Sequence, residues 1–529
     1  MGCSASQPET VSRKQNNINS DEKVSKMRCP SPKTDTENVP VTVVNKNQSV
    51  TMASVKRSHS NLKETYNYQK IDQHAREVSK MRCPSPKTDT ENVPVTVVNK
   101  NQSVTMASVK RSHSNLKETY NYQKIDQHAR KAPNSVKNSA EELVKYMSTV
   151  SKDPRMLARG FFVWSSENIK YDVEGFFGRA TKAPNDAESV MKNGRSVCEG
   201  YASVFELLCR KAGIPVKKIS GFSKGYGYSA AKPLTLSTST DHAWNAVQLE
   251  GKWYLLDSTW GAGHLDSETN SFKKKFDDFY FLTDPKQFVS AHFPYMDNNL
   301  EESQKWQLLP KPLSLEEFNK NVEYKPEAFR LGVLAISHPQ AYFEMKNEVE
   351  MTFKSKGKEE ITITARLMLK EGNWLKEQRN TTFEYLEKGA NKLLVHPKSP
   401  GTYQLTIFGK LVSDDNNEKI PEIMEYIIKC TEVKDKDHEY PVAFGAASTE
   451  RCILHEPLRG NLPANTQVQF RVSAPHLQHV MVEHTYLEKS GTMFTGNVTT
   501  HAPGYQVSMY GTRGEKHGRL DGLYKFHTV

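Results

Sequence analysis

The stretch that decides the fold runs from Gly194 to Gly263. It begins GRSVCEGYASVFELLCRKAGIPV and later reads TDHAWNAVQLEGKWYLLDSTWGAG. It supplies one cysteine, one histidine and one aspartate, in the order Cys198, His242 and Asp257. We interpret these residues as a nucleophile, a base and a residue that orients the base. This interpretation depends on two local predictions, a helix that starts near the cysteine and a hairpin that brings the other two side chains together.

A helix is predicted to begin next to Cys198. Ser196 and Glu199 have the spacing of a capping box, with serine at the N-cap and glutamate three residues later. Apolar residues then recur at helical spacing, and a glycine and a proline end the helix: Tyr201, Val204, Phe205, Leu208, Ala212, Gly213 and Pro215. Cys198 therefore falls in the first turn, where the helix dipole favours the thiolate that attacks carbonyl carbon. Cys209, near the other end of the helix, is interpreted as a packed thiol.

A β-hairpin is predicted to hold the histidine and the aspartate. Residues 243–249 and 252–258 are rich in Val, Trp, Tyr and Leu, and Glu250-Gly251 can form a two-residue turn. Asp257 would then be a diagonal neighbour of His242 on one face, roughly 7–8 Å away at the backbone, so their side chains can share a hydrogen bond. A three-residue loop would place them on opposite faces. The predicted register has three pairs: Leu249 with Lys252, Trp244 with Asp257, and His242 with Thr259.

Each of these residues taken alone is more often structural. A cysteine after a helix start is usually a packed thiol, a histidine on a strand is usually half-buried and satisfied, and an aspartate at a strand end is usually solvated. The ordered set is stronger than its members, because the helix start and the hairpin parity agree.

The segment from Trp164 to Trp260 resembles a transglutaminase-like cysteine enzyme core. W-S-S-E-N-I-K-Y-D resembles the helix and turn before the nucleophile, V-C-E-G-Y-A the nucleophile motif, D-H-A-W-N the histidine motif and L-D-S-T-W-G the aspartate motif. Further on, F-Y-F-L-T-D-P (279–285), H-F-P (292–294) and W-Q-L-L (306–309) resemble the kyphoscoliosis peptidase family of animal cytoskeleton-associated proteins. The resemblance covers residues 132 to the C-terminus. It implies that Cys198, His242 and Asp257 form a catalytic triad, and none of the three positions departs from the pattern.

The resemblance implies a cysteine-dependent acyl-transfer enzyme that acts on proteins, above all a peptidase associated with the cytoskeleton. The triad alone does not choose between water and a lysine amine as acyl acceptor, so a protein-crosslinking transglutaminase stays open. A different class of function is a non-catalytic cytoskeletal scaffold or peptide-binding protein. We expect protein substrates of cytoskeletal type and a cytoplasmic, cytoskeleton-associated location.

Length and composition limit the number of domains and the kinds of cofactor and compartment that we expect. A length of 529 residues suggests two to four domains, and an apolar fraction of 36% is low for one compact globule. The seven cysteines show no CxxC pair and no Cys/His spacing suited to zinc, and we see no convincing calcium loop, so no metal or cofactor is expected. Sparse unpaired cysteine suits a reducing compartment. No apolar run is long enough to span a bilayer, and no secretory signal is present.

The basic charge is concentrated at the N-terminus. The first 130 residues carry +9 of the net charge of +11, and they contain one 53-residue sequence twice, at 24–76 and 78–130, without a change. Such identity indicates recent duplication or an error of sequence assembly, because old structural repeats diverge. The charge therefore says little about the folded part, and we expect no nucleic-acid partner.

The chain begins Met1-Gly2-Cys3-Ser4-Ala5-Ser6, which fits the myristoylation pattern with Gly2 as acceptor. Cys3 is a candidate for palmitoylation. Because one myristoyl chain binds membranes only marginally, a second acyl chain or the basic residues would be needed for anchoring. We predict a peripheral membrane contact through this acylated end; the alternative is a chance match.

The sequence predicts an α+β fold class: a papain-like, transglutaminase-like core, followed by two β-sandwich modules and preceded by a disordered tail. The tail covers residues 1–131, the catalytic domain 132–315, and the modules 320–436 and 437–529. Helices are predicted at 140–148 and 154–169. Residues 221–240, rich in Gly, Ser, Thr and Tyr, are predicted to form a loop that gates the site or a plain connector. Strands are predicted at 348–353, 361–368, 391–395, 403–411, 467–472, 479–484, 492–498, 506–511 and 522–527.

Overall fold

The structure is a computed structural model that describes residues 120–266, 269–357, 359–372, 374–414, 419–516 and 518–529. The predictions for Gly2, Cys3, the tandem repeat up to residue 119 and the disordered tail up to the same point lie outside the described residues. Within the described ranges, no helix is both long and apolar enough to cross a bilayer.

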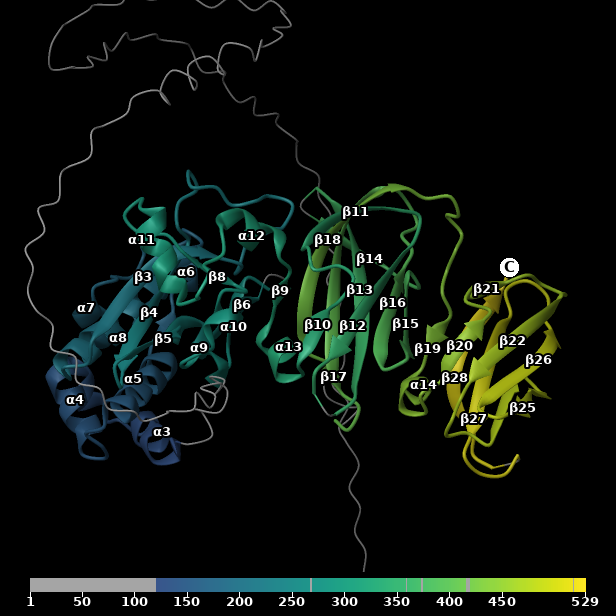
Figure 1. The fold of residues 1–529 in the computed structure, drawn as a ribbon, viewed down its shortest axis with the longest axis horizontal. Helices are drawn as coiled ribbons and strands as arrows, with labels where there is room; N and C mark the ends of the chain where they lie inside the picture. Colours follow the sequence, from purple (N-terminus) through teal and green to yellow (C-terminus); the bar gives the residue numbers. More distant parts are fainter. Residues whose placement is uncertain (1–119, 267–268, 358, 373, 415–418, 517) are drawn as a thin grey trace, which may run out of the picture. The chain divides into compact units, whose positions relative to one another are not determined.

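The first domain is an α+β unit built on a four-stranded antiparallel sheet with the order β5-β4-β3-β8 (Figure 1). Its strands are β1 Lys170–Tyr171, β2 Arg195–Ser196, β3 Val216–Ser223, β4 His242–Leu249, β5 Lys252–Leu256, β6 Gly263–Asp266, β7 Ser271–Lys274 and β8 His292–Pro294. Its helices are α3 Gln123–Arg130, α4 Ala140–Ser148, α5 Pro154–Asn168, α6 Val173–Phe176, α7 Ala187–Asn193, α8 Cys198–Lys211, α9 Ser258–Ala262, α10 Pro285–Phe288, α11 Leu300–Gln304 and α12 Leu315–Lys320, with 3-10 turns η2 Asn134–Asn138, η3 Asp278–Tyr280 and η4 Lys305–Gln307.

Helices α5 and α8 form the centre of this domain and pack together and against β4. The apolar face of α8 is fully buried, as its spacing predicted, and shares one core with the aromatic residues of α5: Tyr201, Val204, Phe205, Leu208, Phe161, Phe162 and Trp164. The predicted helices at 140–148 and 154–169 are confirmed as α4 and α5.

The predicted boundary at residue 132 is wrong, because α3 (Gln123–Arg130) belongs to the folded domain. Ile125 and Ala129 are completely buried in the core shared with α5 and α8. Asp126 accepts two hydrogen bonds from Arg159 of α5, at 2.8 and 2.7 Å, and both residues are buried. The polar sequence QKIDQHAR hides this role, because only two of its residues are apolar.

The second part is a β-sandwich of two sheets, with the orders β10-β12-β16-β15 and β11-β18-β17-β13-β14. The short strand β9 pairs with β18 at the side of the second sheet. The elements are β9 Glu323–Tyr324, α13 Pro326–Arg330, β10 Val333–Ala335, β11 Tyr342–Lys346, β12 Val349–Ser355, β13 Ile361–Glu371, β14 Trp374–Gln378, β15 Thr382–Glu387, β16 Ala390–Val395, β17 Gly401–Leu411 and β18 Glu422–Glu432.

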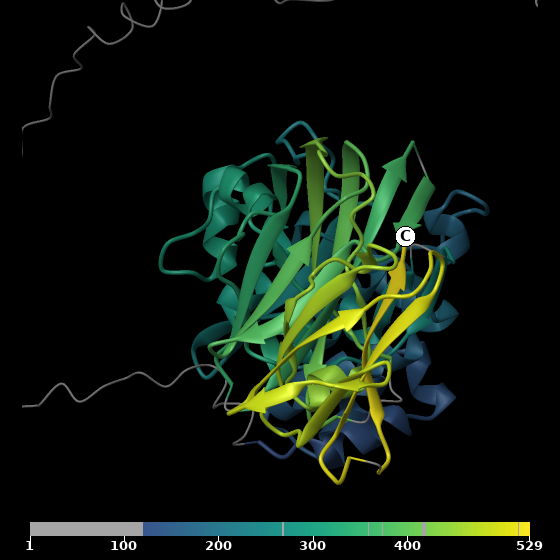
Figure 2. The same ribbon diagram turned by 90° about the vertical axis from the view of Figure 1, so that its right-hand side faces the viewer.

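The third part, yellow in Figure 2, is a second β-sandwich. Its sheets have the orders β19-β28-β27-β23-β24, with β21 beside β28, and β20-β22-β26-β25. The elements are β19 Val442–Ala443, α14 Gly445–Thr449, β20 Ile453–Glu456, β21 Asn461–Leu462, β22 Gln467–Ser473, β23 His479–Val482, β24 Thr485–Tyr486, β25 Glu488–Ser490, β26 Met493–Thr499, β27 Gln506–Thr512 and β28 Asp521–Thr528.

Every predicted strand of the two sandwiches coincides with an observed one, within a few residues at the ends. The prediction missed several strands, among them β11, β14, β15 and β20, and the longest of those missed is β18 (Glu422–Glu432), which lies between β17 and β11 in its sheet. Its inward residues include Ile423, Tyr426 and Ile428, all buried.

Candidate active site

Helix α8 begins at Cys198, as predicted, but the capping box is wrong. The N-cap is Val197, which makes no side-chain cap bond. The Ser196 hydroxyl instead donates to the Pro184 carbonyl and the Asn185 side chain, both at 2.9 Å. Ser196 is fully buried in β2, so its hydroxyl is committed to these tertiary partners. Glu199 pairs with Lys218.

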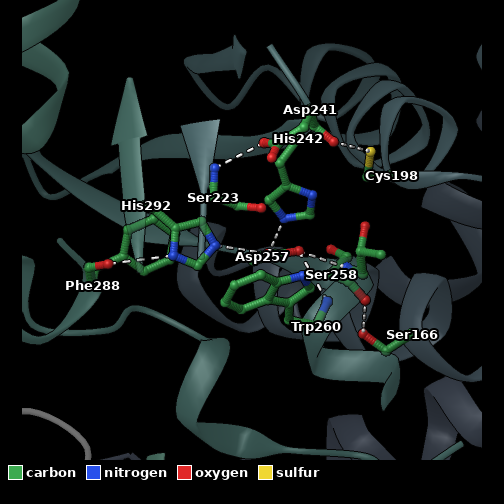
Figure 3. Close-up of polar contacts among 11 residues, drawn as sticks. Ser166, Cys198, Ser223, Asp241, His242, Asp257, Ser258, Trp260, Phe288 and His292 are labelled. Atoms are coloured by element: carbon green, nitrogen blue, oxygen red, sulfur yellow. Dashed lines mark hydrogen bonds and ion pairs between the residues drawn. The ribbon is translucent and has the colours of Figure 1, made fainter. Parts of the chain in front are cut away.

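The first backbone N–H groups of α8 lie beside the Cys198 side chain. The first N–H groups of a helix have no partner inside it, and in α8 the bonds within the helix begin with Gly200 and Tyr201, which both donate to the Val197 carbonyl. Gly200 is needed for this start, because a Cβ there would lie 2.1 Å from the Ser196 hydroxyl oxygen. The Cys198 sulfur is half-buried and donates to the Asp241 carbonyl at 3.9 Å, a long contact suited to sulfur (Figure 3).

The hairpin register is confirmed at its turn. Leu249 pairs with Lys252, and Glu250 and Gly251 have φ values of 48° and 74°, which suits a two-residue turn. The hairpin ends earlier than predicted, because β5 stops at Leu256 and Asp257 is the N-cap of α9. The predicted pairings of Trp244 with Asp257 and of His242 with Thr259 are therefore wrong, since the last pair is Asn245 with Leu256 and Thr259 lies in that helix.

His242 and Asp257 meet as predicted. The His242 Nε2 lies 2.6 Å from the Asp257 Oδ2, and both residues are buried (Figure 3). The Asp257 Oδ1 accepts the backbone N–H groups of Thr259 and Trp260, at 2.8 and 3.0 Å. These three contacts fix the carboxylate, so the N-cap position rather than the strand pairing aims it at the histidine.

His242 and Asp257 each stabilise the charged form of the other. Burial raises the pKa of Asp257, but the neighbouring His242 and His292 lower it more, so the group is ionised. Burial lowers the pKa of His242, but the charge of Asp257, the hydrogen bond to it and the neighbouring Cys198 raise it well above its ordinary value. Because Asp257 can only accept, His242 donates from Nε2 and turns its other nitrogen toward the side of Cys198. The three predicted residues are thus brought together.

The prediction missed His292, which contacts the same carboxylate. Its Nε2 lies 3.0 Å from the Asp257 Oδ2, and the residue is 1% exposed. It sits on β8, which pairs with β3, so the sheet brings it to a site that lies 35 residues earlier in the chain. The H-F-P motif was the only sequence signal, and it carried no indication of a contact with Asp257.

Aromatic rings close the site around the two histidines. Trp260 stacks on His242 at 5.1 Å between ring centroids and lies 4.4 Å from His292. Phe288 stacks on His292 at 3.9 Å, and Trp244 meets its edge at 5.1 Å. This packing excludes water and strengthens the interactions between the charged groups.

His242, Asp257 and His292 also form the one three-donor cluster of metal-binding type among the described residues, with donor atoms within 4.8 Å of one another. Each of these donor atoms is already used in a hydrogen bond within the cluster, and the remaining Asp257 oxygen is held by two amides. We therefore interpret the cluster as a hydrogen-bonded relay.

The predicted gating loop leaves β3 at Ser223 and returns at His242. Its residue Leu234 exchanges two backbone hydrogen bonds with the Asn319 side chain, at 3.0 and 2.9 Å. Tyr226 lies against Phe177 at 5.4 Å between centroids, and its hydroxyl donates to Asn270 at 2.6 Å. The loop is thus held at Tyr226 and at Leu234, and its gating role stays a prediction.

Thiol labelling should single out Cys198 in the folded part. Cys209, Cys430 and Cys452 are buried, and burial raises the pKa of each, that of Cys452 to about 12. We expect native protein treated briefly with iodoacetamide at neutral pH to be alkylated at Cys198 before these three, because thiolates react and buried thiols do not. Peptide mapping by mass spectrometry measures this for each site. Earlier labelling of Cys209 or Cys452 would contradict the assignment.

Two family models match the chain. The model of the transglutaminase-like superfamily matches residues 141–258, and that of the KY-like, immunoglobulin-like domain matches residues 315–441. The α+β unit is therefore a transglutaminase-like domain, and an immunoglobulin-like β-sandwich region follows it, as the sequence predicted.

The relatives make the comparison more specific. A kyphoscoliosis peptidase of Mus musculus is 34% identical over 314 residues, which cover 59% of this chain and 43% of the relative. The Homo sapiens kyphoscoliosis peptidase is 33% identical with the same coverage, and the Drosophila melanogaster protein Hillarin is 32% identical over 145 residues, 26% of this chain and 17% of Hillarin. The chain is a homologue of the kyphoscoliosis peptidases, and the match spans less than half of their length.

Proposed function

We propose that this chain is a cysteine-dependent acyl-transfer enzyme that cleaves protein amide bonds. The observation that carries the proposal is the buried hydrogen bond of 2.6 Å between His242 and Asp257, set beside a cysteine at a helix start. A buried ionised carboxylate has to be paired, and here it is paired with the imidazole that a cysteine nucleophile needs. The names of the mouse and human relatives support the choice of a peptidase.

The geometry suggests the order of proton transfers. His242 takes the thiol proton, and the Cys198 sulfur forms a bond to the carbonyl carbon. The backbone N–H of Cys198 at the helix start can stabilise the oxyanion. His242 then returns the proton to the departing amine as the C–N bond breaks, which leaves a thioester on Cys198. Water attacks the thioester, gives a proton to His242 and releases the acid, so the thiol is restored.

Substrates and location are proposed from the family resemblance. We propose protein substrates of the cytoskeleton and a cytoplasmic site of action, supported by the cytoskeletal character of the resembling family. An anchored N-terminus is proposed from the Gly2-Cys3 pattern alone.

Incubation of the full chain with casein tests the proposed function. A peptidase releases peptides with new N-termini, and this release should vanish in Cys198→Ala, which removes the nucleophile without changing the core. A parallel reaction with dansylcadaverine measures transfer of the acyl group to an amine. Amine incorporation without peptide release would replace the peptidase by a crosslinking enzyme. If neither reaction occurs and Cys198 is not alkylated faster than buried thiols, the chain is a scaffold and the proposal is wrong.

A further inference from the structure

Two histidines share one oxygen atom of a buried carboxylate. The Asp257 Oδ2 contacts the Nε2 of His242 at 2.6 Å and the Nε2 of His292 at 3.0 Å (Figure 3). The two rings lie 5.4 Å apart between centroids with a tilt of 45°, so each approaches the oxygen from its own direction. With the two amides on Oδ1, four donors converge on Asp257.

His292 must carry its proton on Nε2. Its environment is apolar, and burial lowers its pKa despite the nearby carboxylate, so the ring is neutral near neutral pH and has one proton to place. The choice lies between the Asp257 carboxylate at 3.0 Å and the Phe288 carbonyl, 3.3 Å from Nδ1. The shorter bond to a charged acceptor is the stronger one. A neutral donor is therefore fixed on the oxygen that His242 uses.

We propose that His292 is a positioning residue that shares the Asp257 Oδ2 with His242 and so limits how tightly His242 holds its proton. The inference rests on the proposed acyl transfer, because it concerns the group that shuttles the proton in that reaction. Cysteine, histidine and aspartate would suffice for a triad, and His292 is a fourth member that touches neither the nucleophile nor the substrate.

The physical reason is competition for negative charge. A carboxylate that serves a single imidazolium stabilises it strongly, which makes the imidazolium a poor acid. The His292 N–H, bound to the same oxygen, neutralises part of the negative charge of the Asp257 carboxylate. The positively polarised hydrogen of this N–H also faces His242. His242 can then release its proton more readily to the departing amine, because a general acid works best when its pKa lies near the working pH.

Few other groups can disturb this arrangement. The titratable side chains that face His292 are Asp257, His242 and, at 6.4 Å between rings, Tyr280. His242 faces Cys198 and Asp241 in addition. The remaining faces of both rings are covered by Trp244, Trp260 and Phe288.

Two substitutions separate the hydrogen bond from the packing. His292→Phe keeps a ring against Phe288 but has no donor. His292→Gln loses the ring but places an amide N–H close to the former Nε2, so it can still donate to Asp257. A role in packing predicts that Phe resembles the wild type and Gln does not, whereas a role as donor predicts the reverse.

The titration of His242, followed by NMR of the full chain with ¹⁵N-labelled histidine, is the direct test. It is recorded in the Cys198→Ala background, because removal of the thiol removes one of the contacts that raise the His242 pKa. We expect His292→Phe to raise the pKa of His242 by about one unit, the size of one lost hydrogen bond, and His292→Gln to leave it near the Cys198→Ala value.

The outcomes decide the proposal even if the chain has no turnover, because the titration needs none. An unchanged or lowered His242 pKa in His292→Phe would overturn it, as would a shifted pKa in a folded His292→Gln. The second variant decides alone if the first does not fold. With Cys198 present, release of peptides from casein at neutral pH should be slower in His292→Phe and preserved in His292→Gln, because the departing amine needs the proton of His242. Absence of this release in the wild type would count against the proposed function, not against the hydrogen-bond role.

Discussion

Changing Asp257 to asparagine is expected to remove most turnover while the fold survives. The asparagine amide would present two N–H groups where the carboxylate presented Oδ2, and it would still offer an oxygen to the amides of Thr259 and Trp260. Both histidines can adapt by moving the proton from Nε2 to Nδ1. For His292 this change is harmless, because its Nδ1 then donates to the Phe288 carbonyl at 3.3 Å.

For His242 the same change is fatal to the proposed chemistry. Its Nδ1 would carry a proton on the side of Cys198 and could no longer accept the thiol proton. In a Ser-His-Asp enzyme the corresponding change costs about 10⁴-fold in turnover. We expect a loss of about 10²-fold to 10³-fold here, because a thiol is more acidic than a hydroxyl and depends less on its base. The loss should be smaller than in Cys198→Ala or His242→Ala.

Casein cleavage and thermal melting of Asp257→Asn, Cys198→Ala and His242→Ala, measured side by side, check this expectation. Asp257→Ala is the matched contrast, because it leaves four buried donors without an acceptor and should lower the melting temperature as well as the rate. Turnover of Asp257→Asn at the wild-type rate would mean that Asp257 only caps α9 and that the triad is a dyad.

The features of the site that the sequence predicted are those encoded by neighbouring residues. Glu250-Gly251 fixes the hairpin register through its φ values, and the apolar spacing after Cys198 fixes the helix start. These signals are local, because turn geometry and helical periodicity involve residues only a few positions apart. They predicted that His242 and Asp257 meet, although Asp257 does so as the N-cap of α9 and not as a strand residue.

The features that the sequence did not predict are set by distant contacts. Ser196 has the residue type and spacing of a cap, but the nearby carbonyl of Pro184 takes its hydroxyl. His292 reaches Asp257 only because β8 pairs with β3, a register that no short motif encodes. Local patterns therefore predicted the contact between His242 and Asp257 and missed His292, which shares the Asp257 oxygen.

The same limit explains the boundary of the domain. The helix α3 has the composition of the tail, and its eight residues occur again at 69–76 in the first copy of the repeat. Nothing in the octapeptide marks it as part of a domain. The tertiary contacts of α3 place it in the domain, because it binds Arg159, which is 4% exposed, and contributes Ile125 to the core.

A chain that begins at Ala132 is therefore expected to be severely destabilised, whereas one that begins at Tyr120 should melt like the full chain. Loss of α3 exposes the core that Ile125 and Ala129 cover, and it removes the carboxylate that makes two bonds to Arg159. Asp278 remains beside Arg159, but it is half-exposed and neutralises the guanidinium from one side only.

Breaking a buried ion pair from one side costs about 3–5 kcal/mol, and re-exposing an isoleucine about 1.5–3 kcal/mol. Together these losses approach the whole stability of a typical domain, about 5–15 kcal/mol. Urea unfolding of the two truncated chains measures the difference, and Asp126→Ala in the longer chain isolates the contribution of the ion pair, which should be about two thirds of the total. If the chain from Ala132 unfolds at the same urea concentration as the chain from Tyr120, α3 only rests on the surface and the domain begins after it. If Asp126→Ala alone matches the full truncation, the ion pair, rather than the apolar face of α3, holds this helix on the domain.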